Sequence, residues 1–187
     1  MELFEFYRIA SRLKRTKRVG WARRIAGEDV ESVADHSLMT AILSMIIASD
    51  RGLDAHRCAA LAVVHDLAES IVGDLPPDEL PAERKHAMER EAMDELTDVL
   101  EDGDILSRIY REYEEGGTEE ARLVHNVDKL EMGLQALSYY LEGKLRDDEA
   151  CEFVEGALRY ISDGEIAEHL LDAAKRYGLK CPNLDNA

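Results

Sequence analysis

Apolar residues recur at intervals of three and four along nearly the whole chain, whereas the strict alternation that marks a strand is almost absent. This pattern predicts an all-α protein, a bundle of about seven to eight helices. We expect them at about residues 2–14, 35–50, 54–71, 81–100, 104–115, 118–142, 148–162 and 163–177. Because repeats and linkers are absent, the sequence indicates one domain over residues 1–180 and a frayed tail over 181–187.

Capping and breaking residues support these boundaries. Ser32 and Asp35 have the spacing of a capping box, and Thr118 is placed to cap a later helix. A long loop is expected over residues 16–34. The run Gly73-Asp74-Leu75-Pro76-Pro77 stops the third helix, because proline cannot continue it.

Composition narrows the setting. With 187 residues, of which 45% are hydrophobic, the chain is long enough to bury a core. No apolar run approaches the ~18 residues of a membrane span, and the N-terminus lacks the pattern of a secretion signal. The three cysteines, Cys58, Cys151 and Cys181, are scattered and odd in number, which predicts no disulfide framework and fits the cytoplasm.

Charge restricts the partners. The net charge of −17 argues against a nucleic-acid polymer, whose phosphates would be repelled. Residues 8–24 nevertheless carry lysines and arginines and no acid. This segment fits the binding of a small anion or a solvated helix end equally well.

Candidate chemistry centres on His65-Asp66, which lies within the apolar helical run 59–69. His65 and Glu69 share a helix face, and Asp66 lies ~100° around the helix. A carboxylate in such surroundings is costly unless it is paired or binds a metal. The alternative is an ordinary His-Asp pair on a helix surface.

Two further residues join this dipeptide. His36 precedes it, on a helix whose other face is expected to lie in the core, and Asp128 follows it in another apolar helix. A single histidine at such a place is more often structural than a ligand, and Asp128 is equally consistent with an ion pair to Lys129 or Arg122. The residues of the expected core face are Leu38, Ile42, Met45 and Ile46.

The order His36…His65-Asp66…Asp128 resembles the signature of the HD-domain superfamily of metal-dependent phosphohydrolases. Residues 33–37, 65–76 and 127–132 are similar to the 5′-deoxynucleotidase branch of that superfamily, and the likeness extends over about residues 3–175. The resemblance implies that His36, His65, Asp66 and Asp128 bind one divalent ion. Two imidazoles and two carboxylates suit Mn²⁺, Co²⁺ or Fe²⁺. The ion would polarise the phosphoryl group and lower the pKa of a bound water.

The resemblance also implies roles for two acids. Glu69 and Asp74 would act beside the phosphate, in proton transfer or by holding a second ion such as Mg²⁺, and Asp74 would contact the deoxyribose. The alternatives are that Glu69 pairs with Arg57 or Lys85 and that Asp74 caps its loop.

Substrate binding in this branch involves an Arg-Trp pair, but glycine precedes Trp21 here. Arg18 is the nearest candidate for the phosphate-binding arginine, and Arg23 is the alternative. Trp21 either stacks on the nucleoside or anchors the core. The expected substrate-binding set is Arg18, Trp21, Asp66, Asp74, Leu75, Pro76, Pro77 and Asp128. The remaining histidines, His56, His86, His125 and His169, are expected to be surface or core residues.

The resulting hypothesis is a cytoplasmic 5′-deoxynucleotidase, a homodimer by resemblance, that hydrolyses deoxynucleoside 5′-monophosphates with a metal-activated water. One alternative is an HD-domain phosphohydrolase that acts on another small nucleotide phosphoester. Another is a non-catalytic helical domain that binds a metal or nucleotide. The intact acids Glu69 and Asp74 disfavour the latter.

Overall fold

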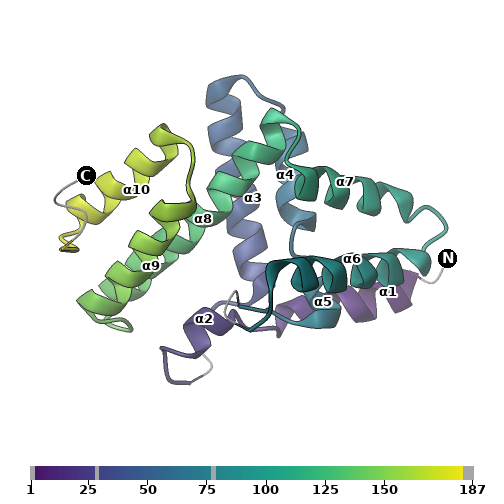
Figure 1. The fold of residues 1–187 in the computed structure, drawn as a ribbon, viewed down its shortest axis with the longest axis horizontal. Helices are drawn as coiled ribbons and strands as arrows, with labels where there is room; N and C mark the ends of the chain where they lie inside the picture. Colours follow the sequence, from purple (N-terminus) through teal and green to yellow (C-terminus); the bar gives the residue numbers. More distant parts are fainter. Residues whose placement is uncertain (1–2, 28–29, 77–78, 183–187) are drawn as a thin grey trace.

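The structure, a computed structural model, describes residues 3–27, 30–76 and 79–182. These residues form helices joined by turns and loops, with a single isolated bridge between Lys17 and Ser32. The all-α prediction is therefore confirmed (Figure 1). The elements are α1 (Leu3–Ala10), η1 (Ser11–Lys14), α2 (Val19–Ala22), α3 (Val33–Arg51), α4 (Ala55–Val64), α5 (Glu69–Val72), α6 (Ala82–Asp98), α7 (Asp104–Glu115), α8 (Glu119–Leu141), α9 (Asp147–Tyr160) and α10 (Gly164–Arg176). Within the part of the chain described, no helix is both long and apolar enough to cross a membrane.

Helix α3 forms the centre of the domain together with α4 and α8, both of which pack against it (Figure 1). Helices α9 and α10 extend this core on one side of α8, and α5, α6 and α7 lie on the other side. The predicted caps are present: the Ser32 hydroxyl accepts the Asp35 N–H, and the Asp35 carboxylate accepts the Ser32 N–H. Thr118 accepts the Ala121 N–H and begins α8.

The helix predicted over residues 54–71 is broken in the structure. Helix α4 ends at Val64, and residues 65–68 form a tight turn before α5. Bonds from Leu67 N–H to the Val64 carbonyl and from Glu69 N–H to the Asp66 carbonyl span three residues rather than four. This tightening re-aims His65 and Asp66 relative to a continuous helix. The helix predicted at 2–14 likewise ends at Ala10 and continues as η1.

The expectation that the apolar face of α3 lies in the core was wrong. Leu38, Ile42, Met45 and Ile46 are 58, 40, 40 and 61% exposed. The buried face instead carries mostly small and polar residues, namely Val33, His36, Ser37, Thr40, Ala41, Ser44 and Ala48. Small side chains let α4 and α8 approach α3 closely, so the apolar residues of α3 lie on the outside.

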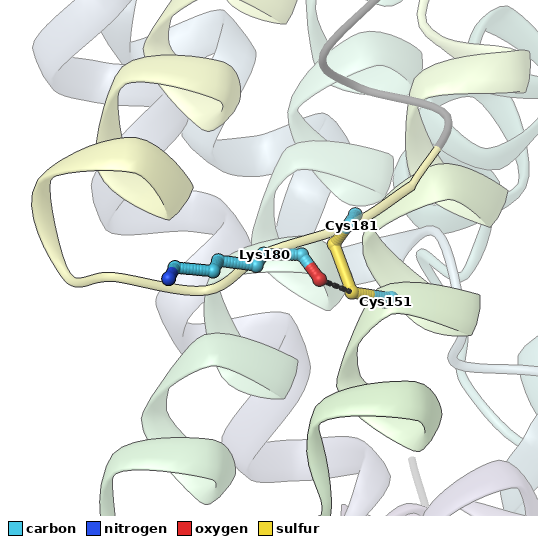
Figure 2. The surroundings of a disulfide bond; sticks show 3 residues. All are labelled: Cys151, Lys180 and Cys181. Atoms are coloured by element: carbon cyan, nitrogen blue, oxygen red, sulfur yellow. Dashed lines mark hydrogen bonds between the residues drawn. A yellow bond between two sulfur atoms is a disulfide. The ribbon is translucent and has the colours of Figure 1, made fainter.

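The cysteine prediction was also wrong. Cys151 of α9 and Cys181, after α10, form a disulfide with a Cα–Cα distance of 5.3 Å (Figure 2). The Cys151 sulfur also lies 3.4 Å from the Lys180 carbonyl oxygen. Cys58 is free and buried. The predicted tail therefore begins with a buried, bonded residue, its last five residues lie outside the described part, and the cysteines no longer support a cytoplasmic assignment.

Candidate metal centre and phosphate site

Four residues from distant parts of the chain converge beside α3. His36 comes from the first turn of α3, His65 and Asp66 from the turn after α4, and Asp128 from α8. His36 Nε2 lies 3.2 Å from Asp128 Oδ1 and 3.8 Å from Asp66 Oδ2, and His65 Nε2 lies 3.2 Å from Asp66 Oδ2. The structure thus brings together the four residues that the sequence order singled out.

Both imidazole rings are held from behind. His36 Nδ1 lies 2.5 Å from Glu131 Oε2, and His65 Nδ1 lies 2.7 Å from the Ala62 carbonyl oxygen. If these nitrogens carry the protons, the lone pair of each Nε2 points into the cluster.

The donor set fits a divalent cation. The Nε2 atoms of His36 and His65 are buried without a hydrogen-bond partner in the described residues. An unsatisfied buried polar atom costs about 1–3 kcal/mol, so its presence needs a reason. One ligand atom each from His36, His65 and Asp66 lie within 4.8 Å of one another, and an ion there would satisfy all of them. Asp128 also pairs with Lys129, through its other oxygen, at 2.7 Å.

Opposing charges shape the titration of this cluster. Burial and the positive charge of Arg18 lower the pKa of His36, but the adjacent carboxylates of Asp128 and Glu131 outweigh both and raise that pKa to about 10. Burial by itself raises the pKa of Asp66, yet the neighbouring His65 ring and the positive charge of Arg18 hold it below its ordinary range. The metal-free cluster therefore keeps a proton where an ion would replace it.

Arg18, immediately before α2, is the arginine that reaches the cluster. Its Nη1 lies 3.4 Å from Asp66 Oδ2, and its side chain is 16% exposed. Burial opposes its charge, but the surrounding carboxylates of Asp66, Asp74 and Asp128 raise its pKa. Arg23 instead pairs with Glu79 at the surface. Of the two candidates, only Arg18 stands beside the metal-ligand candidates.

Glu69 is a buried acid at the start of α5, 3% exposed. Its Oε2 has no hydrogen-bond partner among the described residues. Burial raises its pKa well above the ordinary value, and the negative charges of Asp66 and Asp74 add to this effect. Neither alternative partner is bound to it: Arg57 pairs with Glu112, and the Lys85 ammonium donates to the Leu75 carbonyl.

Asp74 links two loops. Its carboxylate accepts the backbone N–H of Val19, so the 73–76 loop is tied to the residue that follows Arg18. This bond agrees with the loop-capping alternative, and the charge of Asp74 acts on Arg18 and Glu69 nearby. Leu75 and Pro76 follow in the same loop, whereas Pro77 lies outside the described residues.

Trp21 lies in the core, as one of its two predicted alternatives expects. The residue is 2% exposed, and its ring centroid lies 5.4 Å from that of Tyr139 and 4.1 Å from that of Phe153. Its indole N–H donates to Glu31 Oε1 at 2.6 Å. A ring enclosed in this way has little surface left for stacking on a nucleobase.

Comparison with known proteins identifies the family. The sequence profile described as HD domain matches residues 10–168. The chain belongs to the HD-domain family. Over 153 residues it is 42% identical to 5′-deoxynucleotidase HDDC2 of Homo sapiens, covering 78% of this chain and 74% of that protein. Over 146 residues it is 40% identical to 5′-deoxynucleotidase hdd1 of Schizosaccharomyces pombe, covering 74% of this chain and 73% of that protein.

Solved structures share the fold of this HD domain. The PH0347 protein from Pyrococcus horikoshii OT3 superposes with a TM-score of 0.72 at 30% identity, covering 93% of this chain and all but 1% of the other. A conserved hypothetical protein from Pyrococcus furiosus has a TM-score of 0.71 at 28% identity, with 92 and 99% coverage. These two structures support the fold, and the relatives named 5′-deoxynucleotidase support assignment to that branch of the HD domains.

A cavity of about 470 Å³ opens onto the metal-ligand candidates of the HD domain. His65, Asp66 and Asp128 form part of its wall, and Glu89, Tyr110 and Tyr113 line another part. Its volume lies within the usual range for small-molecule sites. The sequence analysis missed this second wall, although Tyr110 and Tyr113 are three residues apart and share a face of α7.

Proposed function

We propose that this HD-domain protein is a metal-dependent 5′-deoxynucleotidase, which hydrolyses deoxynucleoside 5′-monophosphates to deoxynucleosides and phosphate. The relatives named 5′-deoxynucleotidase support this activity over about three quarters of the chain. One observation carries the chemistry. Two buried imidazoles direct unpartnered Nε2 atoms towards two carboxylates, and a buried acid lies one turn away.

His36, His65, Asp66 and Asp128 would hold the divalent ion. Imidazole and carboxylate donors favour Mn²⁺, Co²⁺ or Fe²⁺, and the acids nearby would suit Mg²⁺ as a second ion. When bound, such an ion polarises the phosphoryl group and makes a bound water a stronger nucleophile.

Arg18 and Glu69 would handle the substrate's charge and proton. The Arg18 guanidinium, already among carboxylates, would bind the phosphate oxygens. Water forms a new bond to phosphorus while the bond from phosphorus to the 5′-oxygen breaks. Glu69, kept neutral by burial, would give its proton to that leaving oxygen.

The loop with Asp74 would select the sugar. Asp74, Leu75 and Pro76 would lie against the deoxyribose; Pro77, the next residue of the expected set, is outside the described residues. A close wall there would leave no room for a 2′-hydroxyl, which is the kind of discrimination that a fitted site provides.

The activity is tested by measuring phosphate release from deoxyadenylate and adenylate, after chelation and after return of Mn²⁺, Co²⁺ or Mg²⁺. We expect no activity in chelator, recovery with metal, and a preference for the deoxynucleotide. Asp66→Asn should abolish turnover, whereas His56→Ala, at a side chain that is 97% exposed, should not. Phosphate release that persists in chelator contradicts the metal mechanism. If the protein releases no phosphate from monophosphates but releases pyrophosphate from a nucleoside triphosphate, its substrate is a different phosphoester.

The outer face of α3 supports the homodimer expected from the resemblance. Leu38, Ile42, Met45 and Ile46 lie four, three and one residues apart, so they form one exposed apolar stripe. Such a stripe is typical of a helix that packs against a second copy. Light scattering should report a dimer for the native chain and a monomer for Ile46→Glu. Ile105→Glu changes an isoleucine on α7 that is 55% exposed, against 61% for Ile46, and should leave the dimer intact.

A further inference from the structure

A second pair of carboxylates lies behind the metal-ligand candidates. One oxygen each of Glu31 and Glu131 and one ring nitrogen of His36 lie within 4.8 Å of one another. Glu131 belongs to α8 and is 3% exposed, while Glu31 belongs to the segment that leads into α3. The 2.5 Å separation of His36 Nδ1 and Glu131 Oε2 is that of a hydrogen bond and leaves no space for an ion between these two atoms.

Glu131 determines how His36 is presented. By accepting the Nδ1 proton, its carboxylate fixes the ring orientation and leaves Nε2 free to bind a cation. The acceptor's negative charge also makes Nε2 a better donor. His65 has only a backbone carbonyl, that of Ala62, in the corresponding position, so the two histidine donors are supported unequally.

Glu31 joins this support to the candidate phosphate-binding loop. Its backbone carbonyl accepts the Arg18 N–H at 3.2 Å, and its backbone N–H donates to the Tyr139 hydroxyl at 2.8 Å. Its side chain accepts the Trp21 indole N–H. Glu31 therefore contacts the backbone of Arg18 and the indole of Trp21, and one of its carboxylate oxygens lies near His36.

We propose that Glu131 and Glu31 are positioning residues and that Trp21 anchors Glu31. Together they would fix the positions of the metal-binding His36 and the phosphate-binding Arg18 relative to each other. This inference rests on the proposed roles of His36 and Arg18. It gives the single tryptophan a role that acts through Glu31 and involves no contact with the nucleobase.

The first test measures metal affinity directly, with Co²⁺ and a competing chromophoric chelator, without substrate. Glu131→Ala should weaken Co²⁺ binding about 10- to 100-fold, the usual effect of losing such a support. Glu131→Gln keeps an oxygen that can accept the Nδ1 proton, so its affinity should fall between those of the native protein and Glu131→Ala. Glu119→Ala removes an exposed acid from the same helix and should bind Co²⁺ like the native protein. Native affinity in Glu131→Ala would overturn the role of Glu131.

The second test separates anchoring from stacking. Trp21→Phe removes the indole N–H and should raise KM by the same factor for every deoxynucleotide, up to about tenfold. A change in base preference would mean that Trp21 contacts the base and would overturn its assignment. Glu31→Ala leaves the aromatic packing of Trp21 in place and should show the same uniform increase in KM. Glu31→Gln keeps an acceptor for the indole N–H, so most of this increase should be absent in that variant. An unchanged KM in Glu31→Ala would contradict the linking role of Glu31.

These tests are distinguishable from a failure of the proposed activity. If the native protein binds Co²⁺ but releases no phosphate from deoxynucleotides, the activity is wrong, while the affinity series still tests Glu131. Circular dichroism of each metal-free variant confirms that the helices are retained before affinities are compared.

Discussion

The disulfide between α9 and the segment after α10 provides a quantitative test of the structure. The two cysteines are separated by 30 residues, and Cys181 is buried. Closing a loop of this length in the unfolded chain removes about 12 cal/mol/K of entropy, which corresponds to about 3.6 kcal/mol at 25 °C. For a domain of this size, each kcal/mol shifts Tm by about 2–4 °C. Loss of the bridge should therefore lower Tm by about 7–14 °C.

The assay compares thermal unfolding of the native protein, Cys181→Ser and Cys151→Ser, each with and without reductant. Reductant should lower Tm of the native protein towards the variants and leave the variants unchanged. Cys58→Ser is the matched control, because it removes a buried sulfur that forms no bridge. Thiol titration of the unfolded, unreduced native protein should give one thiol per chain. Three thiols, or equal Tm values for Cys181→Ser and the native protein, would refute the bridge.

Three further outcomes follow from the geometry of the site and core. Glu69→Gln should lower kcat about 10²- to 10⁴-fold in phosphate-release assays. Because burial raises the pKa of Glu69 and the proton donor must be protonated, native activity should fall as pH rises through that pKa; a pH profile unchanged in Glu69→Gln would contradict this role. In the metal-free protein the pKa of His36 is about 10, so this ring carries a proton at pH 7 that a bound ion must displace. Calorimetry in two buffers at pH 7 should therefore detect about one proton released per ion bound. Zero release would exclude a protonated His36. In Gly133→Ala the added Cβ would meet Leu170 Cδ2 at 2.5 Å, and denaturant unfolding should show a loss of about 1–3 kcal/mol, whereas Gly156→Ala, with open space around it, should not be destabilised.

Much of the fold was predictable because local signals and helical periodicity agree along this chain. The α3 cap, the start of α8 and the proline-rich stop after α5 lie where the residues indicate. The break after Val64 could not be found in this way, because no glycine or proline marks it. The break arises where the turn brings His65 and Asp66 towards α3 and α8. At such a position, tertiary packing overrides the local helix propensity of the residues.

The four metal-ligand candidates were recognisable from residue type and order, whereas the layer behind them was not. Glu131 follows Asp128 by three residues and shares its helix face, so α8 alone contains a signal for its position. Nothing comparable marks Glu31, whose contacts depend on how a loop crosses the base of α3. The orientation of Trp21 depended on the same loop path, which explains why sequence left its two roles open.

The error on α3 and the metal-ligand cluster have a common physical origin. A helix that contributes His36 to a site between itself, α4 and α8 must turn a small and polar face inwards, and Ser37, Thr40 and Ser44 share that buried face. Its apolar residues then lie on the outer face, where they contact either water or the surface of another protein chain. Hydrophobic periodicity indicates only that one face of a helix is buried against other protein. The pattern is the same whether that face packs into the core of the domain or against another chain. Because the site needs the polar face of α3, the apolar stripe of that helix is the surface left for the proposed second copy. This reasoning fails if Ile46→Glu leaves the oligomeric state unchanged.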